Sequence, residues 1–323
     1  MRELPPPGAT AWDFPRSAVG VRHLVRYAER AGLEPAPLLL GTGLRVEDLE
    51  DGRAGVRVVT AAQELRVVRA LARRLPRSGA DVGRRYTVDT FGVMGWAMLT
   101  SATVGEAVEV ALRFIDLSFA FVIPVARVED TPDGPLVVAD LDASPLPADV
   151  RAWLLARDAT AIATVLDSLV PGGVGVVLEL AGDSGRLAFP ANELDRPLVS
   201  ERGADRHAAE TACRAIATTR RAATGTTADV RVLVAQRLRD GAPMQAVADA
   251  LGATPRTLRR WLAAEGTTYQ RVLDEVRSGL AAELLGVGLP VADVAARLGY
   301  AETAALTHAH RRWTGRPPSA ARA

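Results

Sequence analysis

Three arginines near the carboxy terminus, Arg256, Arg259 and Arg260, have the side-chain type and the spacing of a binding surface. On a helix, with about 100° between successive residues, they share one face, and the opposite face is apolar. The apolar face consists of Leu258, Trp261 and Leu262. Each guanidinium offers a planar fork of N–H donors that fits guanine O6 and N7 as well as phosphate oxygens. By itself the pattern fits a nucleic-acid contact and an ordinary solvated arginine face about equally well.

Other residue types offer little catalytic chemistry. Ser184 lies in a Gly-Asp-Ser-Gly run that could hold a nucleophile, but no histidine motif accompanies it, and a tight turn between two strands explains the run better. His308 and His310 are two residues apart, so on a helix they point about 200° apart and cannot bind one metal ion. The chain contains no lysine, which excludes a Schiff-base or phosphate-loop lysine. We therefore expect no catalytic site, no metal and no cofactor.

Charge is divided unevenly along the chain. The 323 residues carry 39 basic side chains, all arginine, and 38 acidic ones, for a net charge of +1. Residues 229–323 hold 13 arginines and 9 acidic residues, whereas residues 1–228 hold 26 and 29. The polar stretch at residues 218–228 has the composition of a linker. A small basic domain joined to a larger acidic one is typical of a nucleic-acid reader attached to a second domain.

Signals of export and membrane insertion are missing from the sequence. No run of 18 apolar residues is present, so we expect no transmembrane helix and no membrane contact. Residues 1–20 contain three consecutive prolines and Asp13 instead of the basic and apolar segments of a secretory signal. Cys213 is the only cysteine, so no intramolecular disulfide can form. We expect a cytoplasmic protein associated with the nucleoid.

The basic part contains an internal repeat. Residues 243–252 recur as residues 290–299, with Pro, Val, Ala, Leu and Gly at the same places and an offset of 47. Proline in the first turn and glycine at the end are start and stop signals of a short helix. Each copy is followed by a short turn and a second helix, which is the helix-turn-helix arrangement. In such units the second helix enters the major groove of DNA.

The two copies differ in the helix that would reach DNA. In the first copy, Thr254 is a good N-cap, Pro255 suits the first helical position, and Gly266 can end the helix. The second copy has a turn that is one residue longer and an exposed face with less charge, so it should position the domain more than it specifies sequence. We expect His310, at the border of the apolar stripe, to be a buried neutral imidazole. Residues 269–285 predict a helix that joins the two units.

Four segments of this part carry family motifs in order. They are residues 247–266, the pattern Arg277, Ala281 and Leu284-Leu285, residues 294–300 and residues 311–318. Together they resemble the DNA-binding domain of AraC/XylS-type transcription regulators. The resemblance implies a bacterial regulator that binds double-stranded promoter or operator DNA, forms a homodimer and contacts RNA polymerase.

The resemblance also implies which side chains contact DNA. In the first unit these are Arg256, Thr257, Arg259 and Arg260, and in the second they are Thr303, Ala304, Thr307, His308 and Arg311. The sequence departs from the family pattern at four positions. Leu306 and His310 stand where phenylalanine is usual, His308 stands where arginine is usual, and Ala321 stands where a tyrosine is usual.

Residues 1–228 show a mixed α/β pattern. Capping boxes at Thr60–Gln63 and Thr103–Glu106 open two amphipathic helices. Further helices are expected at residues 148–169 and 204–218, and short strands at residues 119–128, 136–141, 174–180 and 186–189. No glycine-rich dinucleotide motif follows a strand.

A looser resemblance extends over most of this larger part. Gly32-Leu33, residues 91–107 and residues 194–198 are similar to the effector and dimerisation domain of amino-acid- and fatty-acid-responsive members of the same family, although the segment between Leu180 and Arg186 is shorter here. The resemblance implies a small-molecule effector. Phe91, Met94, Trp96 and Met98 could line an apolar pocket for it or pack in the core, which is the commoner role. Leu155, Ile162 and Leu169, seven residues apart, could form a dimer seam or face the sheet of their own domain.

The sequence thus predicts an α+β fold. An amino-terminal extension (1–20) precedes a mixed α/β effector and dimerisation domain (21–217), a linker (218–228) and an all-α DNA-binding domain (229–323) with two helix-turn-helix units joined by a linker helix. The leading function is a sequence-specific transcription regulator controlled by a small effector. One alternative is an effector-independent regulator that acts constitutively or through a protein partner. The other is an enzyme with an appended DNA-binding domain, for which the sequence offers no catalytic constellation.

Overall fold

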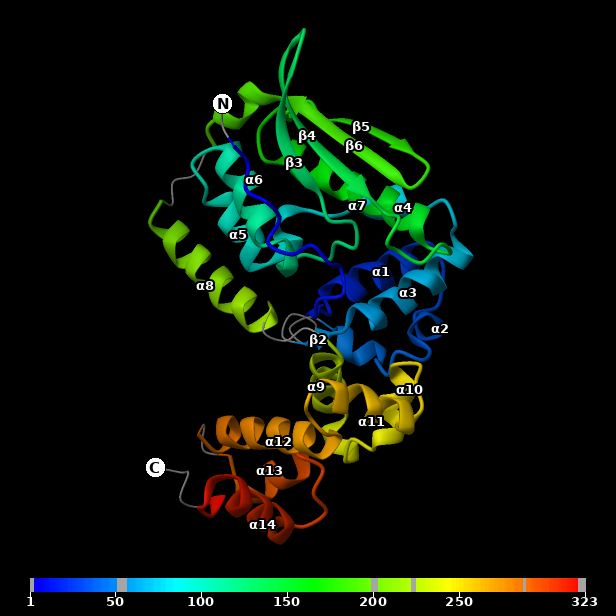
Figure 1. Cartoon of the computed structure of the whole chain (residues 1–323), viewed down its shortest axis with the longest axis vertical. Coiled ribbons are helices and arrows are strands. Elements are labelled where there is room, and N and C mark those ends of the chain that lie inside the picture. Colours follow the sequence, from blue (N-terminus) through cyan, green and yellow to red (C-terminus); the bar gives the residue numbers. More distant parts are fainter. Residues whose placement is uncertain (1–2, 51–56, 199–202, 222–224, 287–288, 319–323) are drawn as a thin grey trace. The chain divides into compact units, whose positions relative to one another are not determined.

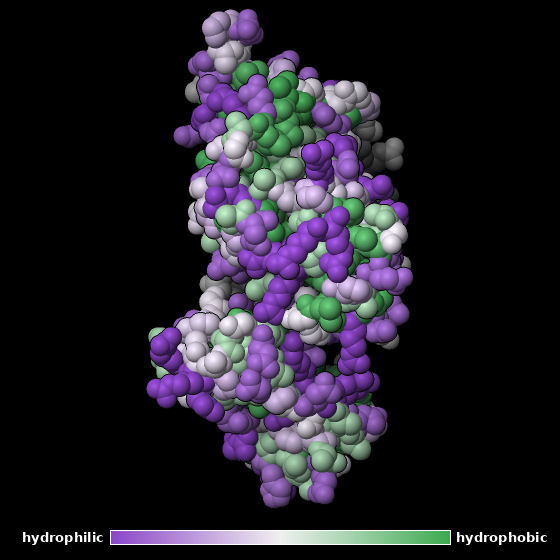
Figure 2. Space-filling view, turned by 90° about the vertical axis from the view of Figure 1, so that its right-hand side faces the viewer, coloured by the Kyte–Doolittle hydropathy of each residue, from purple (hydrophilic) through white to green (hydrophobic). Residues whose placement is uncertain are grey.

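A computed structural model describes residues 3–50, 57–198, 203–221, 225–286 and 289–318 of the chain (Figure 1). The chain divides into two compact units, Met1–Ala222 and Ala223–Ala323. The first unit is mixed α/β and the second is helical in its described residues, which confirms the predicted fold class. Hydrophilic residues cover most of the face seen in Figure 2, and hydrophobic ones lie in separate groups between them. Among the described residues, no helix has the length and apolar character needed to cross a membrane.

The first unit contains a four-stranded antiparallel sheet in the order β3-β4-β6-β5, which lies at the top of the unit in Figure 1. Its strands are β3 (Val125–Thr131), β4 (Gly134–Asp142), β5 (Val177–Ala181) and β6 (Ser184–Pro190). Helix α7 (Arg151–Ser168) packs against β4, β5 and β6. Gly182, with φ +58°, is the first of two residues that turn β5 into β6, as a tight hairpin requires. This confirms the turn interpretation of the Gly-Asp-Ser-Gly run.

The predicted strand over residues 119–128 forms only from Val125 onward. Asp158 of α7 accepts the backbone N–H groups of Phe121 and Val122 through Oδ2, both at 2.8 Å. These N–H groups therefore cannot pair with a neighbouring strand. Phe119, Phe121 and Val122 are all buried, so the apolar run reflects a buried loop.

Further helices complete the first unit. They are α1 (Val19–Arg30), α2 (Ala36–Leu39), α3 (Ala61–Arg74), α4 (Gly79–Gly83), α5 (Val93–Leu99), α6 (Val104–Arg113) and α8 (Gly203–Arg221), with 3-10 helices at Val46–Leu49, Val88–Phe91, Ile115–Leu117 and Ala191–Asp195. The capping box of α3 is present, because Thr60 Oγ1 accepts the Gln63 N–H at 3.1 Å and Gln63 Oε1 accepts the Thr60 N–H at 2.9 Å. At α6, Thr103 accepts the Glu106 N–H at 3.3 Å, but the Glu106 carboxylate accepts the N–H of Ala102.

The expected amino-terminal extension is part of the first unit. Strand β1 (Arg16–Ser17) pairs antiparallel with β2 (Val58–Val59). Phe14, Arg16 and Ala18 are buried, so residues expected to lie outside the domain lie in its core. The structure thus differs from the predicted boundary at residue 21, because long-range contacts of Arg16 with Glu64 and Phe119 hold this segment.

The α7 seam faces its own unit. Leu155 is 2% exposed, and Ile162 and Leu169 pack partly buried against the same core. The structure therefore agrees with the second interpretation, packing within the domain, and a dimer seam stays untested.

The expected linker at residues 218–228 is helical at both of its ends. Helix α8 continues to Arg221, and α9 (Thr226–Arg237) begins directly after Gly225, its N-cap, which has φ +92°. Glycine tolerates this conformation and is an acceptable N-cap. Residues 222–224 lie outside the described residues.

The second unit contains the two predicted helix-turn-helix pairs. After α9 and a 3-10 helix at Leu238–Asp240, the elements are α10 (Met244–Ala250), α11 (Pro255–Ala264), α12 (Tyr269–Gly286), α13 (Val291–Arg297) and α14 (Thr303–Thr314). The turn at residues 298–302 is one residue longer than the turn at residues 251–254, as predicted. The joining helix α12 packs against α9, α13 and α14. One apolar core is shared by both pairs.

Candidate nucleic-acid interface and ligand cavity

Helix α11 begins and packs as its sequence predicts. Thr254, the N-cap, accepts the Thr257 N–H through Oγ1 at 3.2 Å, and Pro255 takes the first helical position. Leu258 and Leu262 are completely buried. Trp261, expected on the same face, is 36% exposed because it lies at the edge of the apolar stripe. The apolar contacts fix the opposite face of α11 toward solvent.

Arg256, Arg259 and Arg260 lie on this solvent face and are exposed. Within the described part of the chain, their guanidinium groups have no hydrogen-bond or ion-pair partner. Three other arginines among the described residues of the unit pair with carboxylates: Arg231 lies 2.8 Å and Arg271 lies 3.4 Å from Glu275, and Arg312 lies 3.0 Å from Asp274. The fold therefore leaves the donors of the three α11 arginines available for an external partner.

Thr257, the fourth predicted contact of α11, is less available. Its hydroxyl lies 3.1 Å from that of Thr254, and the side chain is partly buried. It belongs to the cap that starts the helix, and a DNA contact by Thr257 stays a prediction.

The predicted contacts of α14 form a less charged surface. Thr303, Ala304, His308 and Arg311 are exposed. Thr307 is partly buried, and its hydroxyl donates to the Thr303 carbonyl at 3.0 Å.

The family departures in α14 fit its packing. Leu306 is fully buried, and His310 is 4% exposed, as predicted. The His310 Nδ1 lies 2.7 Å from the Arg316 carbonyl oxygen, to which its N–H donates. Ala321 lies outside the described residues.

Arg277 joins α12 to the second helix-turn-helix pair. Its Nε donates to the Leu298 carbonyl at 3.1 Å, and its guanidinium lies 4.5 Å from the centre of the Tyr300 ring. Leu298 is the C-cap of α13, so Arg277 places a positive charge at the negative end of that helix. Helical periodicity alone predicts that Arg277 faces solvent on α12. It does not reveal the contacts of Arg277, because these partners lie more than 20 residues away in the sequence.

Glu265, at the end of α11, caps α9. Its two carboxylate oxygens accept the N–H groups of Thr226 and Thr227, at 2.9 and 2.8 Å. Burial acts to raise the pKa of Glu265, but hydrogen bonds from Thr227 and Thr226 outweigh burial and lower the pKa. Sequence reasoning missed this contact, because the cap and the helix are far apart along the chain.

A small apolar cavity lies in the first unit, with a volume of about 90 Å³. Phe91, Met94 and Met98, which the sequence proposed for a ligand pocket, line it. Trp96 does not line it and is 38% exposed. Met94 and Met98 are four residues apart on α5 and share a face, whereas Trp96 points about 200° away from Met94. The prediction for Trp96 is therefore wrong.

Next to the cavity lies a buried network of charges that the sequence did not reveal. Glu64 lies 3.6 Å from Arg16 and 3.5 Å from Arg157, and Arg157 lies 2.6 Å from Asp158. All four side chains are less than 5% exposed. Burial raises the pKa of Glu64, although Arg16 and Arg157 oppose the shift.

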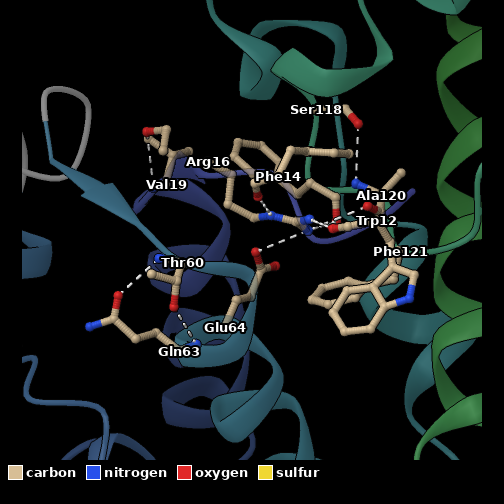
Figure 3. Close-up of polar contacts among 12 residues, drawn as sticks. Trp12, Phe14, Arg16, Val19, Thr60, Gln63, Glu64, Ser118, Ala120 and Phe121 are labelled. Atoms are coloured by element: carbon tan, nitrogen blue, oxygen red, sulfur yellow. Dashed lines mark hydrogen bonds and ion pairs between the residues drawn. The ribbon is translucent and has the colours of Figure 1, made fainter. Parts of the chain in front are cut away.

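Arg16 lies at one end of this network and has further partners (Figure 3). Its guanidinium lies 4.4 Å from the ring centres of Phe14 and Phe121 and donates to the Phe119 carbonyl at 3.2 Å. Figure 3 shows Glu64 below Arg16 on α3. The network ties β1, α3 and α7 together, and no local pattern in the sequence marks contacts between segments so far apart.

Comparison with known proteins finds a matching domain family for each of the two units. Residues 32–194 match the amino-terminal arabinose-binding domain of AraC transcription regulators, and residues 247–323 match a helix-turn-helix domain. The chain is 35% identical over 355 residues to the HTH-type transcriptional regulator Rv1395 of Mycobacterium tuberculosis, with coverage of 99% of this chain and 98% of that protein. It is 29% identical over 267 residues to the ornithine utilization regulator of Pseudomonas aeruginosa, with coverage of 76% and 78%.

Among solved structures, the transcriptional regulator CdpR from Pseudomonas aeruginosa is similar over 94% of this chain and 98% of that chain, with 24% identity and a TM-score of 0.41. The two domain matches and the full-length relative settle the family. The chain belongs to the AraC/XylS-type family of DNA-binding helix-turn-helix transcription regulators.

Proposed function

We propose that the protein is a sequence-specific regulator in which Arg256, Arg259 and Arg260 of α11 read base edges in the major groove. The observation that carries this proposal is the lack of any partner for these three exposed guanidiniums among the described residues. Helix α14 contributes a second, weaker contact through Thr303, Ala304, Thr307, His308 and Arg311. Because its exposed face carries less charge, α14 positions the protein on DNA more than it selects sequence.

Alanine substitution tests the base-reading role. Operator fragments are first selected from genomic DNA with the full-length protein, and affinities are then measured by fluorescence anisotropy. Replacing one of Arg256, Arg259 or Arg260 should cost about 1–3 kcal/mol on the operator and much less on random DNA. Arg271→Ala is the matched control, because Arg271 lies on α12 in the same unit and pairs with Glu275 at 3.4 Å. Equal losses on both DNAs would reduce the role of α11 to phosphate contacts.

The amino-terminal unit binds a small-molecule effector in this proposal. The support is the cavity lined by Phe91, Met94 and Met98, in the domain that matches the arabinose-binding domain of AraC regulators. A thermal-shift screen of the full-length protein with amino acids, fatty acids, aromatic acids and uncharged analogues tests it. If no class raises the melting temperature, the effector-independent regulator becomes the better account.

Ornithine, which gives one of the relatives its name, is a poor candidate for this cavity. An amino acid with two ammonium groups needs carboxylate partners. Among the described residues, Asp158 is the one carboxylate that lines the cavity, and its oxygens already accept hydrogen bonds from Arg157, Phe121 and Val122.

Assembly as a homodimer and contact with RNA polymerase are proposals that rest on the family. Sedimentation equilibrium of the full-length protein tests the first, and a transcription assay with purified polymerase tests the second. A dimer that survives polar substitution of Ile162 and Leu169 would agree with the inward packing of α7.

A further inference from the structure

A groove on the first unit collects positive charge. Its volume is about 470 Å³, and ligand sites in proteins typically have about 300–1,000 Å³. Four arginines line the groove, Arg22, Arg26, Arg30 and Arg85, whereas Asp89 is the one carboxylate among its described lining residues. No described residue lines both this groove and the small apolar cavity. The groove is therefore a separate feature of the unit, with its own charge.

Two segments bring these arginines together. Arg22, Arg26 and Arg30 are four residues apart on α1, so they share one face of that helix. Arg85 lies just after α4, and its guanidinium is 5.5 Å from the centre of the Tyr27 ring, which also lines the groove. A guanidinium that stacks on an aromatic ring keeps its in-plane N–H donors for another partner.

Arg30 and Arg85 have no carboxylate partner in the described part of the chain, and both are exposed. Arg84, the direct neighbour of Arg85, pairs with Asp81 instead. The unit as a whole is acidic, since residues 1–228 hold 26 arginines and 29 acidic residues. Carboxylates for pairing are thus plentiful along this part of the chain, and the groove is a place where the fold does not supply them.

The positive charges in the groove are unfavourable for the unit by itself. Like charges four residues apart destabilise a helix, as in the row of arginines on α1. His23, which also lines the groove, adds no charge at pH 7, because burial lowers its pKa to about 4, with help from Arg157, Arg30 and Arg85. An anion bound in the groove would remove the repulsion that the chain leaves in place.

We propose that the groove binds a small molecule with two or more negative charges, a polycarboxylate or a phosphate ester, which Arg30 and Arg85 hold through charge-assisted hydrogen bonds. The fork of a guanidinium fits two oxygens of a carboxylate or a phosphate. A ligand with several charged oxygens can contact both α1 and the segment of Arg85. The proposal goes beyond the effector function proposed above, which rests on the apolar cavity.

Three anions built on a three-carbon chain test the charge requirement. They are tricarballylate with three carboxylates, glycerol 3-phosphate with a phosphate ester, and glycerate with a single carboxylate. Dissociation constants are measured by isothermal titration calorimetry on the full-length protein at pH 8 and constant ionic strength. The variants are Arg30→Gln, Arg85→Gln and the matched control Arg84→Gln, which removes the same charge one residue away but does not line the groove.

The wild type should bind tricarballylate or glycerol 3-phosphate at least about tenfold more tightly than glycerate, and the tighter of the two identifies the ligand class. Arg30→Gln and Arg85→Gln should each weaken that anion about five- to tenfold, and Arg84→Gln less than about twofold. Arg85→Lys, which keeps the charge but loses the fork, should have an intermediate effect. Replacing Arg256, Arg259 and Arg260 together by alanine should leave the constant unchanged, because these arginines lie in the other unit.

These outcomes also state what would overturn the assignment. Absence of binding by both multivalent anions, or glycerate binding as tight as theirs, would show that the groove is no such site. Equal effects of Arg84→Gln and Arg85→Gln would mean a general loss of charge. Binding that disappears with the three arginines of α11 would place the anion on the other unit. Failure to bind either anion, together with weaker operator binding by Arg30→Gln and Arg85→Gln, would make the groove a contact for DNA phosphates.

Discussion

The residues that define this protein's chemistry are arginines, and their roles differ according to their partners. Arg277 is bonded to the end of α13, and Arg16 lies in the core against Glu64 and aromatic rings. Arg259 and Arg260 have no partner among the described residues. An arginine held by a carboxylate or a carbonyl has fewer donors left for DNA. Helical spacing in the sequence predicts that α11 is the reader, but only the structure separates the paired arginines from the unpaired ones.

His23 makes the stability of the first unit depend on pH. Desolvation lowers its pKa from 6.5 to about 4, with help from Arg157, Arg30 and Arg85 and against a hydrogen bond to the Val82 backbone. Between these two pH values the unfolded chain binds a proton that the folded unit does not bind, so stability is lost as the pH falls from about 6.5 toward 4. We expect urea unfolding to show about 1–2 kcal/mol less stability at pH 5.0 than at pH 7.5 from this group.

Two variants isolate this effect. His23→Phe keeps a ring beside Tyr86 and should reduce the pH dependence by that amount. His207→Phe, at an exposed position on α8, is the control and should keep the wild-type pH dependence. A pH profile of His23→Phe that matches the wild type would show that other groups cause the loss.

At the scale of elements, short-range signals predicted the second unit well. Thr254, Pro255 and Gly266 mark where α11 begins and ends, because capping depends on neighbours in the chain. The prediction of a strand over residues 119–124 was wrong, because Asp158, far along the chain, accepts hydrogen bonds from the backbone N–H groups that a strand would use. The burial of residues 14–18 could not be predicted either, since Arg16 depends on Glu64 and Phe119.

Gly299, in the turn of the second helix-turn-helix pair, is required for close packing. It has φ +75°, and a Cβ there would lie 2.0 Å from the Leu238 carbonyl oxygen and 2.9 Å from the Gly241 nitrogen. Gly299→Ala should destabilise the second unit by about 3 kcal/mol, because backbone atoms cannot move aside. Thermal unfolding of the full-length protein measures this.

Gly315, at the end of α14, is the matched control. It has φ +74°, but a Cβ there would meet nothing within 4 Å. Gly315→Ala should therefore cost only the left-handed conformation, about 1–2 kcal/mol. Equal losses for the two variants would mean that the contact with Leu238 adds nothing.

At the scale of the whole molecule, the chain combines a helix-turn-helix unit that the sequence reveals and an amino-terminal unit with a cavity that the sequence reveals only in part. The repeat and its motifs predicted both helix-turn-helix pairs and the joining helix. The cavity and the balanced charges beside it needed the structure, since Tyr86, Asp158 and Glu64 come from separate segments. For Phe91, Met94 and Met98 the sequence left pocket lining and core packing open, and the structure places all three at the cavity.

Two helix-turn-helix pairs in one chain imply a composite DNA site. Since α12 joins the pairs and both share one apolar core, α11 and α14 belong to one rigid reader within the second unit. Recognition helices in such proteins enter successive major grooves about one helical turn apart, roughly 10 base pairs. The protein should therefore cover two adjacent half-sites, with stronger sequence preference in the one that α11 contacts.

Base-resolution footprinting of the full-length protein on genomic DNA tests the central claim most directly. We predict discrete sites with two protected segments about 10 base pairs apart, and loss of the sequence preference in one segment when Arg256, Arg259 and Arg260 are replaced by alanine together. Footprints without discrete sites, or footprints that the triple replacement leaves unchanged, would contradict the assignment of α11 as the sequence reader.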